Sequence, residues 1–428
     1  MNIQDIHNLF LQCSSLSIDT RKIEKNSMFF AIKGENFDAN TFAREALDLG
    51  ALFVVIDNKS YFIDDRTILV EDSLQTLQEL AKFHRNYLGL PIVALTGSNG
   101  KTTTKELINV VLAKKFKTKA TIGNLNNHIG VPLTLLSFSK ETEIGIVEMG
   151  ANHQKEIEFL CEIAQPDFGY ITNFGKAHLE GFGGVEGVIA GKSEMYKYLA
   201  ANQKMVFVNL QDPIQIEKSH GIKAYTFGVN TDSADLNIKE ITANPFVAIH
   251  YNNFEIESHL IGLYNANNIN AAVVIGKYFE VDESDIKSAI EDYIPANNRS
   301  QMMQKGSNEI ILDAYNANPS SMAVAITNFL QLDKKNKIMI LGDMFELGDE
   351  SLYEHKVIVD HLNDQDKALC FVIGKSFYAN LTASENVKFF ETFDAFADYL
   401  KTFKFNENTI LIKGSRGMAL ERTLEYIS

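Results

Sequence analysis

The sequence Gly97-Ser98-Asn99-Gly100-Lys101-Thr102-Thr103 joins an apolar stretch, Ile92–Thr96, to an amphipathic one, Lys105–Leu112. A strand, a glycine loop and a helix in this order predict a phosphate-binding loop, because the glycines let several N–H groups point inward at the N-terminus of a helix. Lys101 is then expected to neutralise the β and γ phosphates, and the Thr102 hydroxyl to reach Mg²⁺. A tight turn capped by threonine is the alternative, and the intact Gly-Lys-Thr core argues against it.

Further apolar strands follow the loop at intervals that leave room for helices. They are Ile144–Met149, Phe168–Thr172 and Met205–Val208. Strands that are apolar along their whole length predict a parallel sheet covered on both faces. The alternating stretch Ile222–His259 predicts an antiparallel edge region, and a helix is expected over Asn267–Tyr278.

The same patterns predict an α/β protein of three domains, because 428 residues exceed one ordinary core. Residues 1–90 form a small α/β unit, with strands expected at 27–32 and 51–56 and a helix at 41–49. Residues 91–297 form the central, mostly parallel sheet of an ATPase. After Pro295 strands and helix-length segments alternate again, with strands expected at 309–313, 337–341, 369–373 and 409–412. This pattern predicts a Rossmann-like domain over residues 298–428.

Composition and charge exclude several classes of protein. The net charge of -15, without a basic tract, argues against nucleic-acid binding. Three distant cysteines indicate neither disulfides nor a zinc site and fit a reducing compartment. The N-terminus lacks a signal-peptide pattern, and no apolar run approaches the roughly 18 residues of a membrane span. We therefore expect a cytoplasmic, soluble protein without membrane insertion.

The spacing of the loop narrows the function, because two residues rather than four separate Gly97 from Gly100. The loop resembles those of the Mur ligases and the folylpolyglutamate synthetases, which share ATP-driven amide formation at a carboxylate. The resemblance implies ATP and Mg²⁺ as cofactors, with Gly97, Ser98, Asn99, Gly100, Lys101, Thr102 and Thr103 holding the nucleotide. A GTPase is disfavoured, because the chain lacks an NKxD segment.

Three side chains that follow the sheet's strands are predicted to complete a metal site with Thr102. Glu148 ends an apolar strand next to the phosphate loop, where a carboxylate is a suitable ligand for Mg²⁺. An ordinary acid at a strand end is the alternative, and the neighbouring loop argues against it. His178, in Ala177-His178-Leu179-Glu180, resembles the Mur ligase histidine that binds a second metal ion; otherwise it is a surface residue. Lys192 resembles the lysine that is carbamylated in several Mur ligases, which requires a neutral amine, whereas its ordinary interpretation is a solvated lysine.

Four residues further along the chain are implied to hold the rest of the nucleotide. Asn265 and Asn268, in Gly262-Leu263-Tyr264-Asn265, resemble the family's base-contacting asparagines, although Tyr264 replaces the usual histidine and N-capping by Asn265 is nearly as good an interpretation. Arg299 is expected to stabilise charge on the γ-phosphate, and Asp313 to hold the ribose. Without the resemblance, a surface ion pair explains both.

Further motifs imply the substrates. The C-terminal segments 313–322, 341–348 and 413–416 match Mur ligase motifs for a reaction that joins D-alanyl-D-alanine to UDP-N-acetylmuramoyl-tripeptide, through an acyl phosphate, in peptidoglycan precursor synthesis. The residues implied to contact these substrates are Thr20, Arg21, Lys33 and Gly34 for the uridine diphosphate, and Asn126, Asn127, Tyr315, Asn316 and Asn318. The catalytic residues implied are Lys101, His178, Lys192 and Arg299, within a monomer.

Two other functions stay open at the level of sequence. A folylpolyglutamate synthetase-like ligase would share the loop and the metal arrangement, but the segments Tyr315–Pro319 and Leu341–Gly348 argue against it. A nucleotide-binding regulator without catalysis would need the loop alone. Glu148, His178 and Lys192 around one phosphate site favour an active centre.

Overall fold

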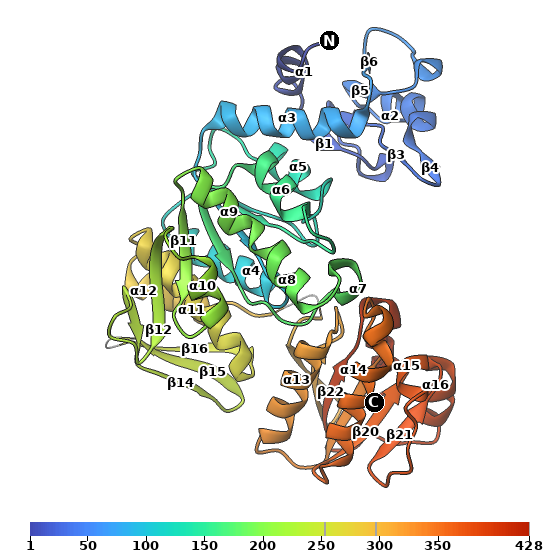
Figure 1. The fold of residues 1–428 in the computed structure, drawn as a ribbon. Coiled ribbons are helices and arrows are strands. Elements are labelled where there is room, and N and C mark those ends of the chain that lie inside the picture. The colour runs from blue at the N-terminus through green and yellow to red at the C-terminus, as the bar shows by residue number, and fades with distance from the viewer. Residues whose placement is uncertain (252–253, 296–297, 428) are drawn as a thin grey trace.

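The computed structural model describes residues 1–251, 254–295 and 298–427. Three α/β lobes follow one another along the chain, and the central lobe lies between the N-terminal and the C-terminal one (Figure 1). The predicted boundary between the central and C-terminal domains falls on residues 296–297, outside the described residues. Across the described chain, no helix is both long and apolar enough to cross a bilayer.

The N-terminal lobe contains a four-stranded parallel sheet in the order β1-β2-β5-β6. Its strands are β1 Leu16–Ser17, β2 Met28–Phe30, β5 Phe53–Ile56 and β6 Thr67–Leu69, and its helices are α1 Ile3–Phe10, α2 Ala43–Asp48 and α3 Ser73–Leu88. A two-stranded hairpin, β3 Lys33–Gly34 and β4 Phe37–Asp38, extends from it. Helix α3 packs on α5 and α6 of the central lobe and so joins the two lobes.

The central sheet has seven parallel strands in the order β13-β12-β11-β10-β7-β9-β8. The strands are β7 Ile92–Thr96, β8 Thr118–Ala120, β9 Ile144–Glu148, β10 Phe168–Ile171, β11 Met205–Asn209, β12 Lys223–Val229 and β13 Leu236–Ile238. The helices between β7 and β12 in the chain are α4 Lys101–Leu112, α5 Gly130–Leu136, α6 Glu156–Ala164, α7 Leu179–Phe182, α8 Val185–Lys192, α9 Glu194–Ala201 and α10 Pro213–Lys218.

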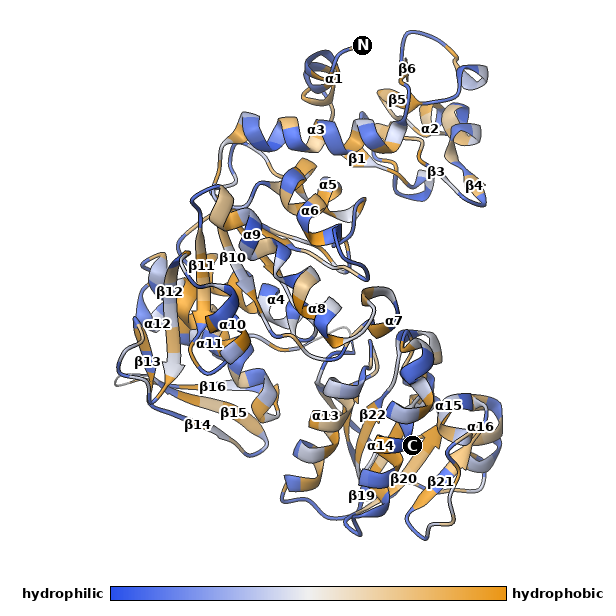
Figure 2. Cartoon of the chain, viewed as in Figure 1, coloured by the Kyte–Doolittle hydropathy of each residue, from blue (hydrophilic) through white to orange (hydrophobic). Residues whose placement is uncertain are grey.

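Alternation along the strands sends side chains into two apolar layers of this lobe. Ile92 and Ala94 contribute to the core shared with α5, α6 and α9, whereas Val93 and Leu95 face α4 and α11 (Ala266–Tyr278) on the other side. Apolar residues accordingly gather along the strands, and hydrophilic ones on the outer helix faces (Figure 2). The parallel sheet covered on both faces is therefore confirmed.

The prediction of an antiparallel edge over residues 222–259 is wrong for its first part. Strands β12 and β13 are parallel to β11 and extend the main sheet. Antiparallel pairing begins only with a separate three-stranded sheet, β14 Glu240–Ala243, β15 Phe246–Tyr251 and β16 Phe254–Ile261. Helix α12, Glu283–Glu291, packs on β16 and α4.

The C-terminal lobe has a six-stranded sheet in the order β17-β18-β22-β19-β20-β21, parallel except for β17. Its strands are β17 Gln301–Lys305, β18 Asn308–Asp313, β19 Lys337–Gly342, β20 Ala368–Ile373, β21 Val387–Phe390 and β22 Thr409–Lys413. Its helices are α13 Pro319–Gln331, α14 Ser351–Asn363, α15 Lys375–Tyr378 and α16 Phe393–Leu400. This is the Rossmann-like arrangement that the sequence predicts, with β17 and β21 added at its edges.

Candidate active site

A cavity of about 760 Å³ lies where the central and C-terminal lobes meet. The carboxyl ends of β7 and β9 supply its floor, which is where open α/β sheets bind ligands. Most predicted site residues line it: Ser98, Asn99, Gly100, Lys101, Thr102, Thr103, Asn126, Asn127, Glu148, His178, Asn265, Asn268, Arg299, Asp313, Tyr315, Asn316 and Asn318.

The phosphate loop is held open by its neighbours from the turn after β10. Gly97 has φ +142°, and a Cβ there would lie 2.0 Å from the Thr172 hydroxyl oxygen. The Ser98 hydroxyl donates to the Gly175 carbonyl at 2.6 Å, and the Asn99 amide N–H donates to Asn173 Oδ1 at 3.2 Å. The loop conformation therefore depends on a segment 74 to 77 positions later in the chain as well as on its own glycines.

Lys101 lies folded over the loop, where its Nζ donates to the Gly97 carbonyl at 2.6 Å. Burial lowers its pKa, a shift that nearby Glu148 opposes and nearby Arg299 reinforces. The backbone carbonyl is a weak partner for a buried ammonium. A phosphate oxygen in the loop would offer the same ammonium a charged partner.

Thr102 and Glu148 form a buried polar pair at the start of α4. The Thr102 hydroxyl donates to Glu148 Oε2 at 2.9 Å, and Asn126 Nδ2 donates to Glu148 Oε1 at 2.7 Å. Glu148 is 1% exposed and, among the described residues, has no ion-pair partner. A buried carboxylate with only neutral donors fits a divalent cation, because an oxygen ligand set of this kind suits Mg²⁺.

His178 reaches the C-terminal lobe, since its Nδ1 is hydrogen-bonded to Glu346 Oε2. Histidines that bind metal ions commonly engage a carboxylate through their second ring nitrogen. The contact with Glu346 therefore leaves Nε2 as the nitrogen that can bind a metal. The His178 side chain is 19% exposed, so solvent reaches it only in part.

Lys192 lies beneath the cavity rather than on its wall. Its side chain is fully buried, its Nζ donates to the Ala151 carbonyl at 3.2 Å, and the ammonium stacks 4.9 Å from the centre of the Phe182 ring. Burial, with a further contribution from Lys101, lowers its pKa well below the usual lysine range. The interpretation as a solvated helix lysine is therefore wrong.

Asn265 and Asn268 hold α11 against the phosphate loop. Asn265 stands at the start of α11 but does not cap it, because its Nδ2 donates to the Ile261 carbonyl and its Oδ1 accepts from Asn268. Asn268 Oδ1 accepts from the Thr104 hydroxyl at 3.0 Å. A Cβ on Gly100 would lie 2.5 Å from that same oxygen, so Asn268 supports the loop from behind.

Arg299 and Asp313 do not form the surface ion pair that the sequence left open. The Arg299 guanidinium stacks 3.6 Å from the centre of the Tyr315 ring. Asp313 Oδ2 pairs instead with buried Lys413 at 2.7 Å, and its Oδ1 accepts from the Ser300 amide at 3.2 Å. Both residues line the cavity from the C-terminal lobe.

Asn318 joins that lobe to the phosphate loop directly. Its Oδ1 caps α13 by accepting from the Ser321 amide at 2.9 Å, and its Nδ2 donates to Asn99 Oδ1 at 2.7 Å. Tyr315 and Asn316 lie nearby on the same wall. The Lys176 amide adds a second link by donating to the Ser320 hydroxyl at 2.8 Å.

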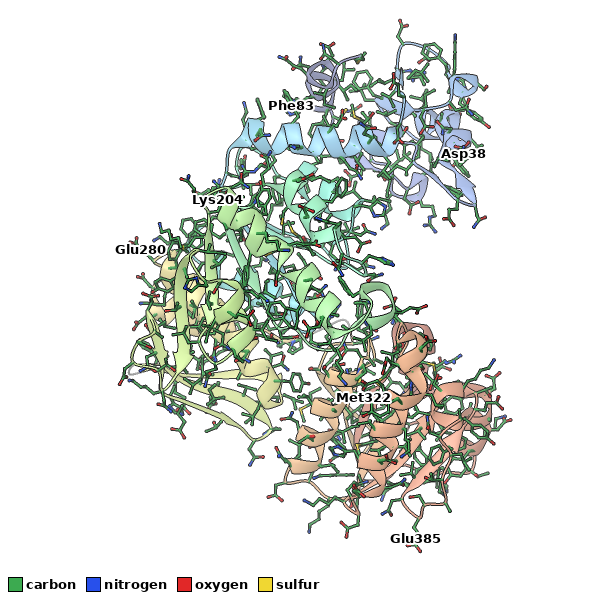
Figure 3. All side chains as sticks on the ribbon, in the orientation of Figure 1. Asp38, Phe83, Lys204, Glu280, Met322 and Glu385 are labelled. Carbon is green, nitrogen blue, oxygen red and sulfur yellow. The ribbon has the colours of Figure 1, made fainter. Side chains whose placement is uncertain are left out.

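The predicted uridine diphosphate residues Thr20, Arg21, Lys33 and Gly34 do not line this cavity. They lie in the N-terminal lobe, in a 3-10 turn at Thr20–Lys22 and in β3. Asp38, which pairs with Lys33 across the hairpin, lies at the right-hand edge of that lobe, and Met322 of α13 lies in the C-terminal lobe at the other end of the view (Figure 3). The structure thus separates these four residues from the phosphate loop.

Sequence reasoning missed several residues of the cavity wall. Glu156 and Phe159 of α6 line it, as does Ser300, whose hydroxyl contacts Tyr264 OH at 2.9 Å. The only signal for Glu156 and Phe159 is that α6 directly follows the loop after Glu148, at the sheet edge where ligands bind.

The central lobe carries a phosphate loop beside a buried acid, and the Rossmann-like C-terminal lobe completes the cavity around them. This arrangement is that of a nucleotide-dependent enzyme whose site is built from two lobes. Family models agree: the Mur ligase middle domain matches residues 95–276, and the Mur ligase, glutamate ligase domain, matches residues 298–416. The chain belongs to the Mur ligase family.

Relatives that match over their full length show which member of the Mur ligase family this chain is similar to. The chain is 33% identical to UDP-N-acetylmuramoyl-tripeptide--D-alanyl-D-alanine ligase of Bacillus subtilis, over 96% of this chain and 92% of that protein. Among solved structures, MurF ligase of Thermotoga maritima in complex with ADP has a TM-score of 0.83 at 27% identity, covering 97% of both chains. UDP-N-acetylmuramoylalanyl-D-glutamyl-2,6-diaminopimelate--D-alanyl-D-alanyl ligase of Acinetobacter baumannii has a TM-score of 0.82 at 29% identity, covering 99% of this chain and 98% of that one.

Proposed function

We propose that the protein uses ATP to join D-alanyl-D-alanine to UDP-N-acetylmuramoyl-tripeptide, an amide-forming step of peptidoglycan precursor synthesis. The observation that carries this proposal is the single cavity that combines the phosphate loop with side chains of the C-terminal lobe. The names of the full-length relatives supply the substrates.

ATP would bind with its phosphates on residues 97–103 and its base near Asn265 and Asn268. The side chains of these two asparagines are hydrogen-bonded to each other, to Thr104 and to the Ile261 carbonyl. Their role is therefore to support the loop rather than to contact the adenine directly. Asp313 would face the ribose, and its bond to Lys413 holds it in place. The Thermotoga maritima relative was solved in complex with ADP, which supports an adenine nucleotide as a ligand of this chain.

Thr102 and Glu148 would hold Mg²⁺, and His178 and Lys192 would contribute to a second metal ion. Bound there, Mg²⁺ would neutralise phosphate charge. An unmodified Lys192 ammonium would oppose a cation, whereas its buried amine, with a pKa well below the usual range, is suited to carbamylation. Carbamylation would be detected by ¹³C NMR as a carbamate signal after exposure to ¹³C-bicarbonate, absent from a Lys192→Met variant.

The reaction would proceed in two steps. An oxygen of the tripeptide carboxylate attacks the γ-phosphorus of ATP, so that ADP leaves and an acyl phosphate forms. The amine of D-alanyl-D-alanine then attacks the acyl carbon, loses a proton, and expels phosphate. Lys101 and Arg299 would stabilise the transferring phosphoryl group, and the two lobes would exclude water that hydrolyses the acyl phosphate.

The three lobes would divide the substrates among them. Residues 1–90 would bind the uridine diphosphate through Thr20, Arg21, Lys33 and Gly34, residues 91–297 the ATP, and residues 298–428 the dipeptide. Asn126 and Asn127 would face the tripeptide, and Tyr315 and Asn316 the dipeptide. Asn318 is better explained as the link to Asn99, because both ends of its amide are already engaged.

Phosphate release tests the proposal. With ATP and Mg²⁺, we expect release that requires both UDP-N-acetylmuramoyl-tripeptide and D-alanyl-D-alanine, and that is abolished in Lys101→Ala. An amide product that forms only with folate and glutamate would establish the folylpolyglutamate alternative instead. ATP turnover indifferent to D-alanyl-D-alanine would rule out the ligase reaction.

A further inference from the structure

One face of helix α6 forms a wall of the cavity that the reaction described above does not use. Glu156, Phe159 and Leu160 all line the cavity. Because residues three and four apart share one face of a helix, these side chains lie together. The wall therefore combines one carboxylate with adjacent apolar surface.

The Glu156 carboxylate is fixed by the backbone that precedes it. Its Oε2 accepts from the amide N–H groups of Asn152 at 2.6 Å and His153 at 3.0 Å. Burial raises the pKa of Glu156, but the two backbone N–H groups and the His153 side chain outweigh it and hold the pKa below the usual glutamate range. The carboxylate is therefore charged at neutral pH and held in one orientation, with Oε1 able to accept from a ligand.

Glu156 differs from the other two acids that line the cavity among the described residues. Glu148 accepts from Thr102 and Asn126, and Asp313 pairs with Lys413. Glu156 Oε1 makes one ion-pair contact, with His153 Nδ1 at 3.7 Å, which is beyond hydrogen-bond length, so this oxygen can still accept a hydrogen bond from a ligand. Glu156 is thus the acid of the cavity that remains able to bind a cationic group of a ligand.

Phe159 supplies the apolar part of this wall. The residue is 39% exposed, although large apolar side chains are normally buried, and it lines the cavity. A carboxylate one helical turn away from an uncovered aromatic ring matches a ligand with a short alkyl chain that ends in a cation.

We propose that this face of α6 binds the side chain of the third residue of the tripeptide, a diamino acid. This inference rests on the proposed function, and the name of the Acinetobacter baumannii relative shows such a residue, 2,6-diaminopimelate. The methylene groups pack against Phe159, and the side-chain amine donates to Glu156 Oε1. Glu156 also lies close enough to Lys192 to influence it electrostatically, which places the amine subsite beside the proposed reaction centre.

Matched pairs of tripeptide substrates test this assignment. In one pair the third residue is lysine or norleucine, and in the other it is diaminopimelate or 2-aminopimelate, so that within each pair only the amine differs. In the wild type we expect kcat/KM to favour the amine by about 10- to 100-fold, the range for a charged hydrogen bond whose partner is removed. In Glu156→Gln, whose amide oxygen can still accept from the two backbone N–H groups, the ratio falls to about 3-fold or less.

Two further variants separate recognition of the amine from general damage. Phe159→Ala is expected to lower kcat/KM for both members of a pair equally and to leave their ratio unchanged. Glu158→Gln removes a carboxylate from the same helix that is ion-paired with Lys155 and does not line the cavity, and it should behave as wild type. Melting temperatures within a few degrees of wild type establish that the variants are folded.

Two results would overturn the assignment: a wild type that does not discriminate within either pair, or a Glu156→Gln variant that keeps the wild-type ratio while losing activity toward both members. Either leaves the proposed function intact, because turnover still depends on D-alanyl-D-alanine. If no tripeptide supports D-alanyl-D-alanine-dependent phosphate release, the proposed function itself fails.

Discussion

The ion pair between Lys176 and Glu354 offers a measure of how firmly the C-terminal lobe docks on the central one. Lys176 Nζ lies 2.5 Å from Glu354 Oε1, across the interface beside the phosphate loop. The two partners differ in burial: the Glu354 side chain is 6% exposed and that of Lys176 is 44% exposed. This difference predicts that the two single substitutions have unequal effects.

Lys176→Met leaves a buried carboxylate without its partner while the lobes are docked. Removing one member of a buried pair costs about 3–5 kcal/mol, whereas a surface pair contributes about 0.2–1 kcal/mol. Because Lys176 is almost half exposed, we expect an intermediate value of about 2 kcal/mol, which corresponds to about a 30-fold change in the docking equilibrium. Glu354→Met leaves only a lysine that water can reach, so its cost should stay below about 1 kcal/mol, or about 5-fold.

Hydrogen exchange of the segment around residues 174–182 measures this equilibrium. The Lys176 amide donates to Ser320 across the interface, so its exchange requires separation of the lobes. We expect exchange about 30-fold faster in Lys176→Met, at most about 5-fold faster in Glu354→Met, and no faster in the double variant than in Glu354→Met. Equal effects of the two single substitutions, or a double variant as fast as Lys176→Met, would refute the reasoning.

Three further substitutions test the site and its supports. Gly97→Ala should abolish ADP binding in a titration while leaving the circular dichroism spectrum intact, because the new Cβ would lie 2.0 Å from a threonine hydroxyl. Lys105→Met removes the buried ammonium that donates to the Thr121 carbonyl at 2.6 Å, so the free energy of unfolding measured in urea should fall by about 1–3 kcal/mol, the cost of a buried acceptor left without its donor. Burial, with a smaller contribution from His84, lowers the pKa of His7 to about 4; thermal stability should therefore fall as pH drops from 6.5 to 4, and less so in His7→Leu.

The fold around the phosphate loop was predictable because its signals are local. Strand β7 occupies Ile92–Thr96 as predicted, since a glycine loop ends it and a helix follows. The direction of β12 was not predictable. This strand is exposed at its start and buried toward its end, and such mixed burial near a sheet edge looks alike whether the neighbouring strand runs parallel or antiparallel.

The positions of site residues were predictable, but the partners of their side chains were not. Asn268 and Asn318 fall in motifs that indicate a site, and both line the cavity. Their amides are nevertheless used within the protein, one with Thr104 and Asn265 and the other with Asn99 and Ser321. These bonds join residues up to 219 positions apart, and hydrophobic periodicity and turn chemistry carry no information about such pairs.

Lys192 shows why burial must be known before chemistry can be assigned. As a sequence, Gly191-Lys192-Ser193 is an ordinary helix end, and a lysine there is solvated in most proteins. The fold places it under Phe182 and beside Lys101, where a charged amine is unfavourable. Lys101 of the predicted phosphate loop thus also supplies a positive charge that favours the neutral amine of Lys192. The two lysines are therefore coupled: replacing Lys101 should change the chemistry of Lys192 as well as the binding of ATP.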